Sequence, residues 1–345
     1  MRSEMRKLFV FLLLVVLLTL SSAKGARRKP KPSSRPKPRP NGNACEKPRG
    51  KSGDFTLTIL HTNDIHSHFE ESNSWGGPCV PDKKNNNSTD HCVAGVTRLA
   101  TLVKKMKEQY PQALFMNAGD FYQGSVWYTV LKHEIVSAVM KELKYDAICL
   151  GNHEFDDGPA GLAPFLGNMT QAKTKVITTN VDISEEPILK GQQVLKSHVF
   201  CVNGTKVGVI GAVTEETRTI ATPGQVKIED VIPSLKDEAK KLKKNGVNVI
   251  VAVTHTGYDV DPKIVREVED LDILVGGHTN TFLYNGRMFR AKKLMKTTQP
   301  CQMCAVRRPP PVVQAGLNGA IRRRNGISST LLRASASSMT ARCQT

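Results

Sequence analysis

Short apolar or β-branched runs alternate with stretches of helical hydrophobic periodicity from residue 55 onward. The short runs predict strands at 55–60, 113–116, 147–150, 176–179, 206–210, 247–253 and 271–275. The periodic stretches predict helices at 93–108, 129–143 and 232–244, and the third is followed by Asn245-Gly246, a typical helix stop. Strands and helices that alternate in this way predict an α/β fold.

The first 53 residues depart from this pattern. In residues 1–23, three basic residues precede an apolar run at 8–20, and small residues follow at 21–23, as in an export signal. A membrane-spanning helix needs about 20 apolar residues, so this run is too short, and no later segment is long enough. We therefore expect a secreted, extracellular protein without a transmembrane segment. Residues 24–53 are basic and Pro-rich, which predicts an extended linker.

The last 59 residues, 287–345, also depart from the pattern, because they contain no Asp or Glu. Their Arg triplet at 322–324 and their Ser/Ala-rich close predict no packed element. Two interpretations stay open: a basic binding tail, or a disordered end produced by a shifted reading frame or by mis-splicing. The expected folded domain is therefore 54–286.

The net charge of +18 belongs to the ends of the chain. Residues 24–53 hold eleven Lys/Arg and one acid, and residues 287–345 hold twelve Lys/Arg, whereas residues 54–286 carry a net charge of −6. A nucleic-acid-binding fold would carry its basic patch on the domain itself, so we expect no nucleic-acid partner. Weak contact of the basic ends with polyanions such as sulfated glycans or anionic membranes stays open beside a plain solvated linker.

Secretion would permit N-glycosylation and disulfides. Sequons of the form Asn-x-Ser/Thr predict glycosylation at Asn86, Asn87, Asn168 and Asn203. Cys149 lies in one predicted strand and Cys201 beside another, so we expect free, packed thiols there. The pair Cys301 and Cys304 stands alone in the tail and indicates no metal site.

Polar residues able to bind metals follow five predicted strands. They lie in NDIH (63–66), NAGD (117–120), GNHEFD (151–156), THTG (254–257) and GGHTN (276–280). Ligands of open α/β sheets bind at the carboxyl ends of the strands, so the five strings describe one converging site. Each string alone is compatible with a turn or a helix cap. Together they suit two divalent metals about 4 Å apart, and their mixed N/O chemistry favours zinc, manganese or iron over calcium.

This ordered series resembles the calcineurin-like metallophosphoesterases. The resemblance rests on Asp64-x-His66, Gly119-Asp120, Gly151-Asn152-His153-Glu154, His255 and Gly277-His278. The longer strings HTNDIHSHFE, NAGDFYQGS, LGNHEFDDG and VGGHTNTFLY are similar to ecto-5′-nucleotidases and secreted apyrases, over about residues 55–285. The resemblance implies a four-layer α/β/β/α sandwich for the domain.

The resemblance also implies a role for each site residue. Asp64 and His66 would bind one metal, and Asp120 would bridge both ions. The second metal would be bound by Asn152, His255 and His278. Asn280 is a candidate metal or phosphate contact, and His68 is a candidate phosphate contact.

A catalytic pair and a disulfide are implied in the same way. His153 with Asp156 would act on the phosphate and the leaving oxygen. Cys79 and Cys92 would form a disulfide that staples the loop between them. The remaining histidines, His91, His133 and His198, match nothing in the family, so surface positions are expected for them.

The implied function is extracellular hydrolysis of nucleotide phosphates such as AMP, ADP or ATP, in which a metal-bound hydroxide attacks phosphorus in line. Family members carry a C-terminal domain that binds the nucleotide, and nothing in this sequence resembles that domain. We therefore expect recognition of the nucleotide, and with it activity, to be impaired. The alternative is a secreted, non-catalytic protein that keeps the metal domain and binds polyanions or nucleotides.

Overall fold

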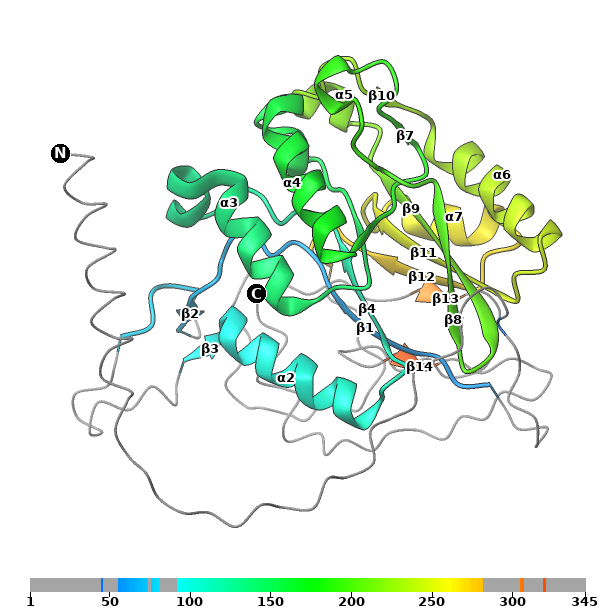
Figure 1. Ribbon diagram of the computed structural model, residues 1–345, viewed down its shortest axis with the longest axis horizontal. Helices are drawn as coiled ribbons and strands as arrows, with labels where there is room; N and C mark the ends of the chain where they lie inside the picture. The colour runs from blue at the N-terminus through cyan, green and yellow to red at the C-terminus, as the bar shows by residue number, and fades with distance from the viewer. Residues whose placement is uncertain are drawn as a thin grey trace, which may run out of the picture. The chain divides into compact units, whose positions relative to one another are not determined.

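The computed structural model describes residues 45, 55–73, 76–80, 92–281, 305–306 and 319–320 (Figure 1). All of them belong to one compact unit, Cys45–Thr345. The predicted signal, almost all of the linker, Asn86, Asn87, His91, Cys301 and Cys304 lie outside the described residues. Within the described part, no helix combines the length and the apolar character that crossing a membrane requires.

Two five-stranded sheets form the centre of the unit. The first has the order β14-β1-β4-β5-β6, in which β1, β4, β5 and β6 are parallel and β14 is antiparallel to β1. Its strands are β1 (Thr58–Thr62), β4 (Leu114–Ala118), β5 (Ala147–Cys149), β6 (Lys175–Val176) and β14 (Gly319–Ala320). Such an arrangement brings the carboxyl ends of β1, β4 and β5 to one edge.

The second sheet has the order β13-β12-β11-β9-β8. Its three central strands are parallel, and both edge strands run antiparallel to their neighbours. Its strands are β8 (Ser197–Val202), β9 (Thr205–Val213), β11 (Val249–His255), β12 (Ile273–Gly276) and β13 (Ala305–Val306).

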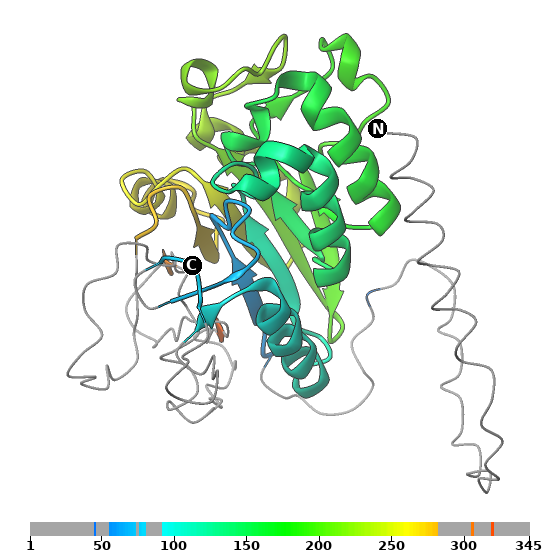
Figure 2. The same ribbon diagram turned by 90° about the vertical axis from the view of Figure 1, so that its left-hand side faces the viewer.

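Helices cover the outer face of each sheet (Figures 1 and 2). The first sheet is covered by α2 (Val96–Gln109), α3 (Val126–Leu143) and α4 (Gly158–Ala172), and the second by α6 (Val231–Lys244) and α7 (Asp261–Glu267). The buried side chains form one cluster under each helical layer and a third between the sheets. The predicted four-layer α/β/β/α sandwich is confirmed.

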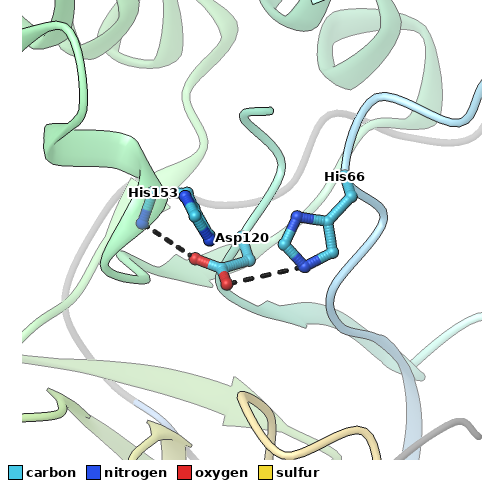
Figure 3. Close-up of side chains that lie close together, drawn as sticks. All are labelled: His66, Asp120 and His153. Carbon is cyan, nitrogen blue, oxygen red and sulfur yellow. Dashed lines mark hydrogen bonds and ion pairs between the residues drawn. The ribbon is translucent and has the colours of Figure 1, made fainter. Parts of the chain in front are cut away.

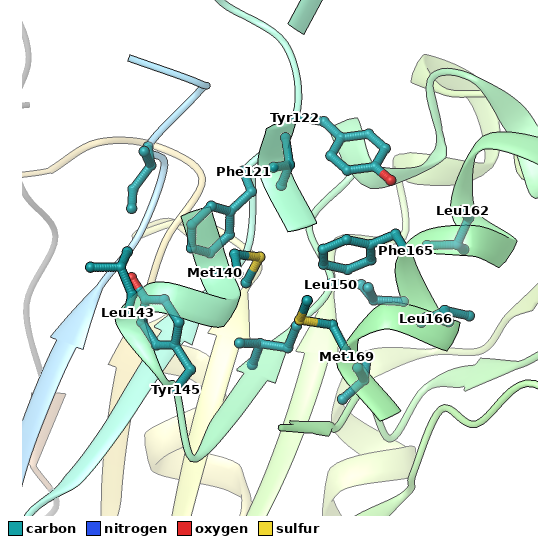
Figure 4. Packing of buried hydrophobic residues seen from close by; sticks show 14 of the residues in the cluster. Phe121, Tyr122, Met140, Leu143, Tyr145, Leu150, Leu162, Phe165, Leu166 and Met169 are labelled. Carbon is teal, nitrogen blue, oxygen red and sulfur yellow. The ribbon is translucent and has the colours of Figure 1, made fainter. Parts of the chain in front are cut away.

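These layers arise because successive side chains along a strand point to opposite faces of the sheet. Leu60 of β1 packs under the helices, whereas its neighbour Ile59 packs between the sheets. In the second sheet Ile210 faces the helices and Val209 faces the other sheet. Successive side chains of a strand point to opposite faces, so a strand that is apolar at every position is buried on both sides. Figure 4 shows the aromatic part of the cluster under α3 and α4, including Phe165.

Shorter elements complete the unit. They are β2 (Glu71–Ser72) paired with β3 (Val93–Ala94), β7 (Val181–Asp182) paired with β10 (Lys227–Ile228), α5 (Thr217–Ile220), and the 3₁₀ turns η1 (His153–Phe155) and η2 (Pro187–Leu189).

All seven predicted strands and three predicted helices occur, with boundaries shifted by a few residues. Three larger elements were not predicted: β8, α4 and α7. Helix α4 contains Gly158, Gly161, Gly167 and Pro164, which obscure its periodicity. Strand β8 lies at the sheet edge with only one fully buried residue, so it lacks a continuous apolar run.

The prediction that residues 287–345 contain no packed element is wrong at two short strands, β13 and β14. No packed element was expected there, yet β13 pairs with β12 and β14 pairs with β1 through the backbone. An open sheet edge offers unpaired N–H and C=O groups to any strand, whatever its side chains, so the residue pattern does not reveal such pairing. The rest of 287–345 lies outside the described residues.

Two disulfides are present in the described part of the chain. Cys79 pairs with Cys92, as the resemblance implied, with Cα atoms 5.6 Å apart. Cys201 pairs with Cys45 across 156 residues, so the prediction of a free thiol at Cys201 is wrong. Cys201 is exposed on the edge strand β8, where a distant cysteine can reach it. Cys149 is buried and free, as predicted.

Candidate metal centre

The backbone at the carboxyl edge of the sheets takes a left-handed conformation at several non-glycine residues, with positive φ angles. These residues are Asp64 (48°), His66 (48°), Asp120 (57°), His278 (82°) and Asn280 (52°). Each such residue costs about 1–3 kcal/mol and persists only where the surroundings fix it. These five are among twelve such residues in the described part of the chain, and their position makes this edge a candidate functional site.

Asp120, which follows β4, lies at the centre of the cluster (Figure 3). Its carboxylate is buried, with Oδ2 lying 2.9 Å from Nε2 of His255 and 3.7 Å from Nε2 of His66. Its Oδ1 accepts a hydrogen bond from the backbone N–H of His153 at 3.1 Å. Asp120 is therefore in contact with loops from both sheets.

Two groups of ligand-type atoms meet at Asp120. His66, Asp120 and His153 form one group, and Asp120, His255 and His278 form the other, with the ligand atoms of each group within 4.8 Å of one another. The two groups adjoin at Asp120, which belongs to both. The first group contains His153, whereas the sequence had predicted Asp64 beside His66 and Asp120.

Asp64 joins the cluster from β1. Its Oδ1 lies 3.8 Å from Nε2 of His66, and its Oδ2 accepts hydrogen bonds from Asn63 Nδ2 at 2.7 Å and from the backbone N–H of His278 at 3.0 Å. Asp64 therefore links the β1 loop of the first sheet to the β12 loop of the second. Because two buried carboxylates lie so close together, the site favours bound positive charge.

The buried polar atoms fit a metal at this place. Among the described residues, Asn152 Oδ1 is buried without a hydrogen-bond partner, whereas the buried Nε2 of His255 lies 2.9 Å from Oδ2 of Asp120. Nδ1 of His255 lies 2.6 Å from the carbonyl of Ala118, to which it can donate, so Nε2 is the nitrogen that could bind a metal. A buried polar atom without a partner is costly, so Asn152 Oδ1 is a candidate to meet a cation.

The charged side chains of the cluster shift one another's pKa values. Burial by itself would lower the pKa of His255, but the negative charge of Asp120 raises that pKa to about 10. Burial by itself would raise the pKa of Asp120. The positive charges of His255, His66 and His153 have the larger effect, so the pKa of Asp120 lies well below its usual value. Because its pKa lies well below the usual value, the carboxylate of Asp120 is ionised.

His153 and Asp156 lie together in the turn η1 after β5. Nδ1 of His153 is 2.7 Å from Oδ2 of Asp156, and this hydrogen bond raises the pKa of His153. The ring of His153 lies edge-on to that of His66, with centroids 5.3 Å apart, and remains partly accessible to solvent. The predicted pair is thus formed beside the cluster and open to a ligand.

Two glycines allow the loops to approach this closely. A Cβ on Gly119, where φ is +88°, would lie 2.7 Å from Nδ1 of His255, and a Cβ on Gly151 would collide with Oδ1 of Asp120. A side chain at either position would therefore displace Asp120 or His255.

Glu154 is a buried residue beside the cluster to which the sequence assigned no role. Its buried carboxylate accepts hydrogen bonds from four backbone N–H groups. The donors are Asp120 at 2.9 Å, Phe121 at 2.7 Å, Tyr122 at 3.1 Å and Gly151 at 2.6 Å. Glu154 thus holds the loop after β4 against the loop after β5. Its place inside GNHEFD was the only signal in the sequence.

Other candidates lie at or beyond the rim. His68 is exposed, with Nδ1 2.9 Å from the carbonyl of His66, and it does not belong to the two groups of ligand-type atoms. Asn280 is half-buried. Nε2 of His278 lies 3.9 Å from the exposed carboxylate of Glu216. His133 and His198, which were expected at the surface, are half-buried.

A four-layer sandwich whose strand ends gather Asp, His and Asn around one shared carboxylate defines the class of metal-dependent phosphoesterases. The family model described as calcineurin-like phosphoesterase matches residues 57–282. The chain belongs to this family.

Known proteins similar to this chain carry two related names. An apyrase of Anopheles gambiae is 38% identical over 247 residues, which cover 71% of this chain and 42% of that protein. A 5′-nucleotidase of Mus musculus is 41% identical over 236 residues, covering 67% and 39%. The crystal structure of a 5′-nucleotidase precursor from Thermus thermophilus matches with a TM-score of 0.60 at 35% identity, over 71% of this chain and 45% of that one. This chain spans less than half the length of each of these relatives.

Proposed function

We propose that this protein is a metal-dependent hydrolase of nucleotide phosphates that works outside the cell. The observation that carries the proposal is the cluster of Asp64, His66, His255 and His278 around Asp120, beside the hydrogen-bonded pair His153 and Asp156. The names of its relatives, apyrase and 5′-nucleotidase, favour nucleotides as the substrate class. The N-terminal sequence favours secretion.

Six residues would hold two divalent ions, most simply zinc or manganese given the N/O ligands. One ion would be held by Asp64, His66 and Asp120, and the other by Asp120, Asn152, His255 and His278. When bound, such ions offset the charge of the phosphate oxygens and activate water for attack on phosphorus.

The protein's own side chains supply orientation and proton handling. Asp156 holds Nδ1 of His153, so Nε2 is the ring nitrogen that is free to meet the substrate. A protonated His153 would donate to the oxygen that leaves phosphorus, and Asp156 would stabilise its positive charge. Glu154 would hold Asp120 and His153 in position relative to each other, because its carboxylate accepts hydrogen bonds from the loops that carry them.

The direct test measures phosphate release by the purified full-length chain. The protein would be loaded with zinc or manganese and assayed with AMP, ADP, ATP and an aryl phosphate, before and after treatment with a chelator. We expect release that disappears with the chelator and returns with metal. The panel also decides between monophosphate and di- or triphosphate preference.

An outcome without hydrolysis would contradict the proposal only if both metals are bound, so metal content is measured on the same sample. Two bound ions and no release from any of the four substrates would favour the non-catalytic binder. Release that persists after chelation and is unchanged in His153→Ala would place the reaction elsewhere.

A further inference from the structure

The two sequons within the described residues, at Asn168 and Asn203, lie in opposite surroundings. Both satisfy Asn-x-Ser/Thr, so the sequence cannot distinguish them. Attachment of a glycan requires a side-chain amide that is accessible and a fold that can accommodate a bulky, hydrated group. The structure meets these requirements at one of the two.

Asn203 lies in the turn of the β8–β9 hairpin. Val202 pairs with Thr205, so Asn203 and Gly204 form a two-residue loop, and their φ angles of +49° and +75° are those of a type I′ turn. Asn203 is exposed, and its side chain has no hydrogen-bond partner among the residues that the structure describes. A group on its amide nitrogen would therefore extend into solvent.

Asn203 is also remote from the metal centre. The turn precedes β9, and the other end of β9, at Val213, pairs with His255. At about 3.3 Å per residue, the strand between Thr205 and Val213 separates the turn from the site by roughly 26 Å. A glycan at Asn203 would leave the site open.

Asn168 lies inside α4 and faces α3. Its Oδ1 accepts a hydrogen bond from Lys141 Nζ at 2.6 Å, and its Nδ2 donates to the buried hydroxyl of Ser137 at 3.3 Å. A glycan on Nδ2 would have to enter the contact between the two helices. A chain modified there could not pack α3 against α4 as observed.

We propose that Asn203 is the site of N-linked glycosylation in the described part of the chain, and that Asn168 stays unmodified in the folded protein. In the reaction, Nδ2 of Asn203 forms a bond to C1 of a lipid-linked oligosaccharide. The bond from C1 to the pyrophosphate oxygen breaks, the lipid pyrophosphate leaves, and the amide loses one proton. The proposal requires entry into the secretory pathway and is independent of phosphohydrolase activity.

The test expresses the full-length chain with its own N-terminus in cells that have a eukaryotic secretory pathway. Glycopeptide mass spectrometry of the secreted, folded protein then assigns the occupancy of each sequon separately. We expect Asn203 to be occupied in the majority of molecules and Asn168 to be unmodified.

Three variants make the result specific. Asn203→Gly removes the acceptor and keeps the positive φ that the turn requires, so it should fold, lose the glycan and retain whatever activity the parent has. Thr205→Ala should lose the glycan as well, because it breaks the sequon, whereas Thr205→Ser should keep it. An unmodified Asn203, or a glycan on Asn168 in folded molecules, would overturn the proposal.

Discussion

Oδ2 of Asp120 lies 2.9 Å from Nε2 of His255, although Asp120 follows β4 of the first sheet and His255 ends β11 of the second. The same oxygen lies 3.7 Å from Nε2 of His66, which belongs to the loop after β1. One carboxylate is thus shared between two groups of ligand-type atoms that come from the ends of five strands. Its removal should affect both groups at once.

Asp120→Ala should lose both metals, because Asp120 alone belongs to the two ligand groups. Elemental analysis of zinc- or manganese-loaded protein should give two ions per chain for the parent and close to none for the variant. Asp230→Asn is the matched control, since this carboxylate is exposed and pairs with Arg218 at 3.2 Å. A parent protein with one ion or none, or a variant that keeps both, would show that Asp120 does not bridge.

The position of this site could be predicted from the sequence because parallel strands deliver their carboxyl ends to one edge. Asp64, Asp120 and His255 each follow an apolar run directly, so the register of the sheets brings them together. Strand order therefore predicts where the site lies, whereas the role of each residue in it was implied by the resemblance and stays a prediction.

Other features depend on partners that no local pattern reveals. Glu154 is bonded to backbone N–H groups of a loop more than thirty residues away, and backbone groups leave no mark on residue identity. Cys201 pairs with a cysteine 156 residues earlier. His61 appeared as part of a motif, yet its imidazole is buried and Nδ1 has no hydrogen-bond partner within the described part of the chain.

His153→Ala should retain both metals and lose most of the turnover of an aryl phosphate. The imidazole handles a proton and binds no ion in our assignment, and such general acid–base contributions are typically about 10²–10⁴-fold. Asp156→Asn should lower kcat less, because it leaves the ring in place and weakens only its orientation. Metal analysis and steady-state kinetics on the same samples check this, and an unchanged kcat in His153→Ala would show that the pair is wrongly assigned.

Glu154→Gln should destabilise the protein and lower its affinity for metal. The amide group of Gln would face at least one backbone N–H that now meets a carboxylate oxygen, and a lost hydrogen bond to a charged group costs about 1.5–3 kcal/mol. Urea unfolding should show a decrease of that size, together with easier removal of metal by a chelator.

The matched control for Glu154 is Glu238→Gln. Glu238 is also buried, but its carboxylate contacts the side chains of Ser197 and Lys241 instead of the backbone of the strand-end loops. It should change stability without changing metal retention. Equal loss of metal in both variants would mean that metal retention only follows global stability.

His61 should make the metal-free protein less stable as the pH falls from about 6.5 to 4. Burial lowers the pKa of His61 from 6.5 to about 4, so within this window the unfolded chain binds a proton that the folded chain does not. The stability is fully present above pH 6.5, and about 3 kcal/mol would be lost by pH 4, at 1.36 kcal/mol per pKa unit. In His61→Gln the decrease on acidification should be smaller.

Asp261 provides a contrast of opposite sign in the same window. Burial raises the pKa of Asp261 from 3.8 to about 7, so the folded chain binds the extra proton and gains stability as the pH falls. Asp261→Asn should therefore lose more stability on acidification than the parent, whereas His61→Gln should lose less. Urea titrations of chelator-treated samples between pH 4 and 7 measure both, and shifts in the same direction would contradict the assignment.

Affinity for polyanions, if the protein has it, should reside in the basic ends of the chain. Residues 24–53 and 287–345 hold 23 of the 49 Lys and Arg residues, whereas 54–286 carries a net charge of −6. Replacing the Lys and Arg residues of 24–53 and of 287–345 by Gln should abolish retention on heparin and binding to anionic vesicles. In the parent, binding should fall steeply with salt as counterion release and screening require.

The described part of the chain offers a control surface for this experiment. A cavity of about 660 Å³ is lined in part by Lys141, Lys144 and Lys173, at the C-terminal ends of α3 and α4. Lysines at these ends also complement the helix dipoles, which accounts for them without a ligand. The double variant Lys144→Gln/Lys173→Gln should therefore keep heparin retention. Loss of retention in this variant, with the ends intact, would move the polyanion site from the ends onto the folded domain.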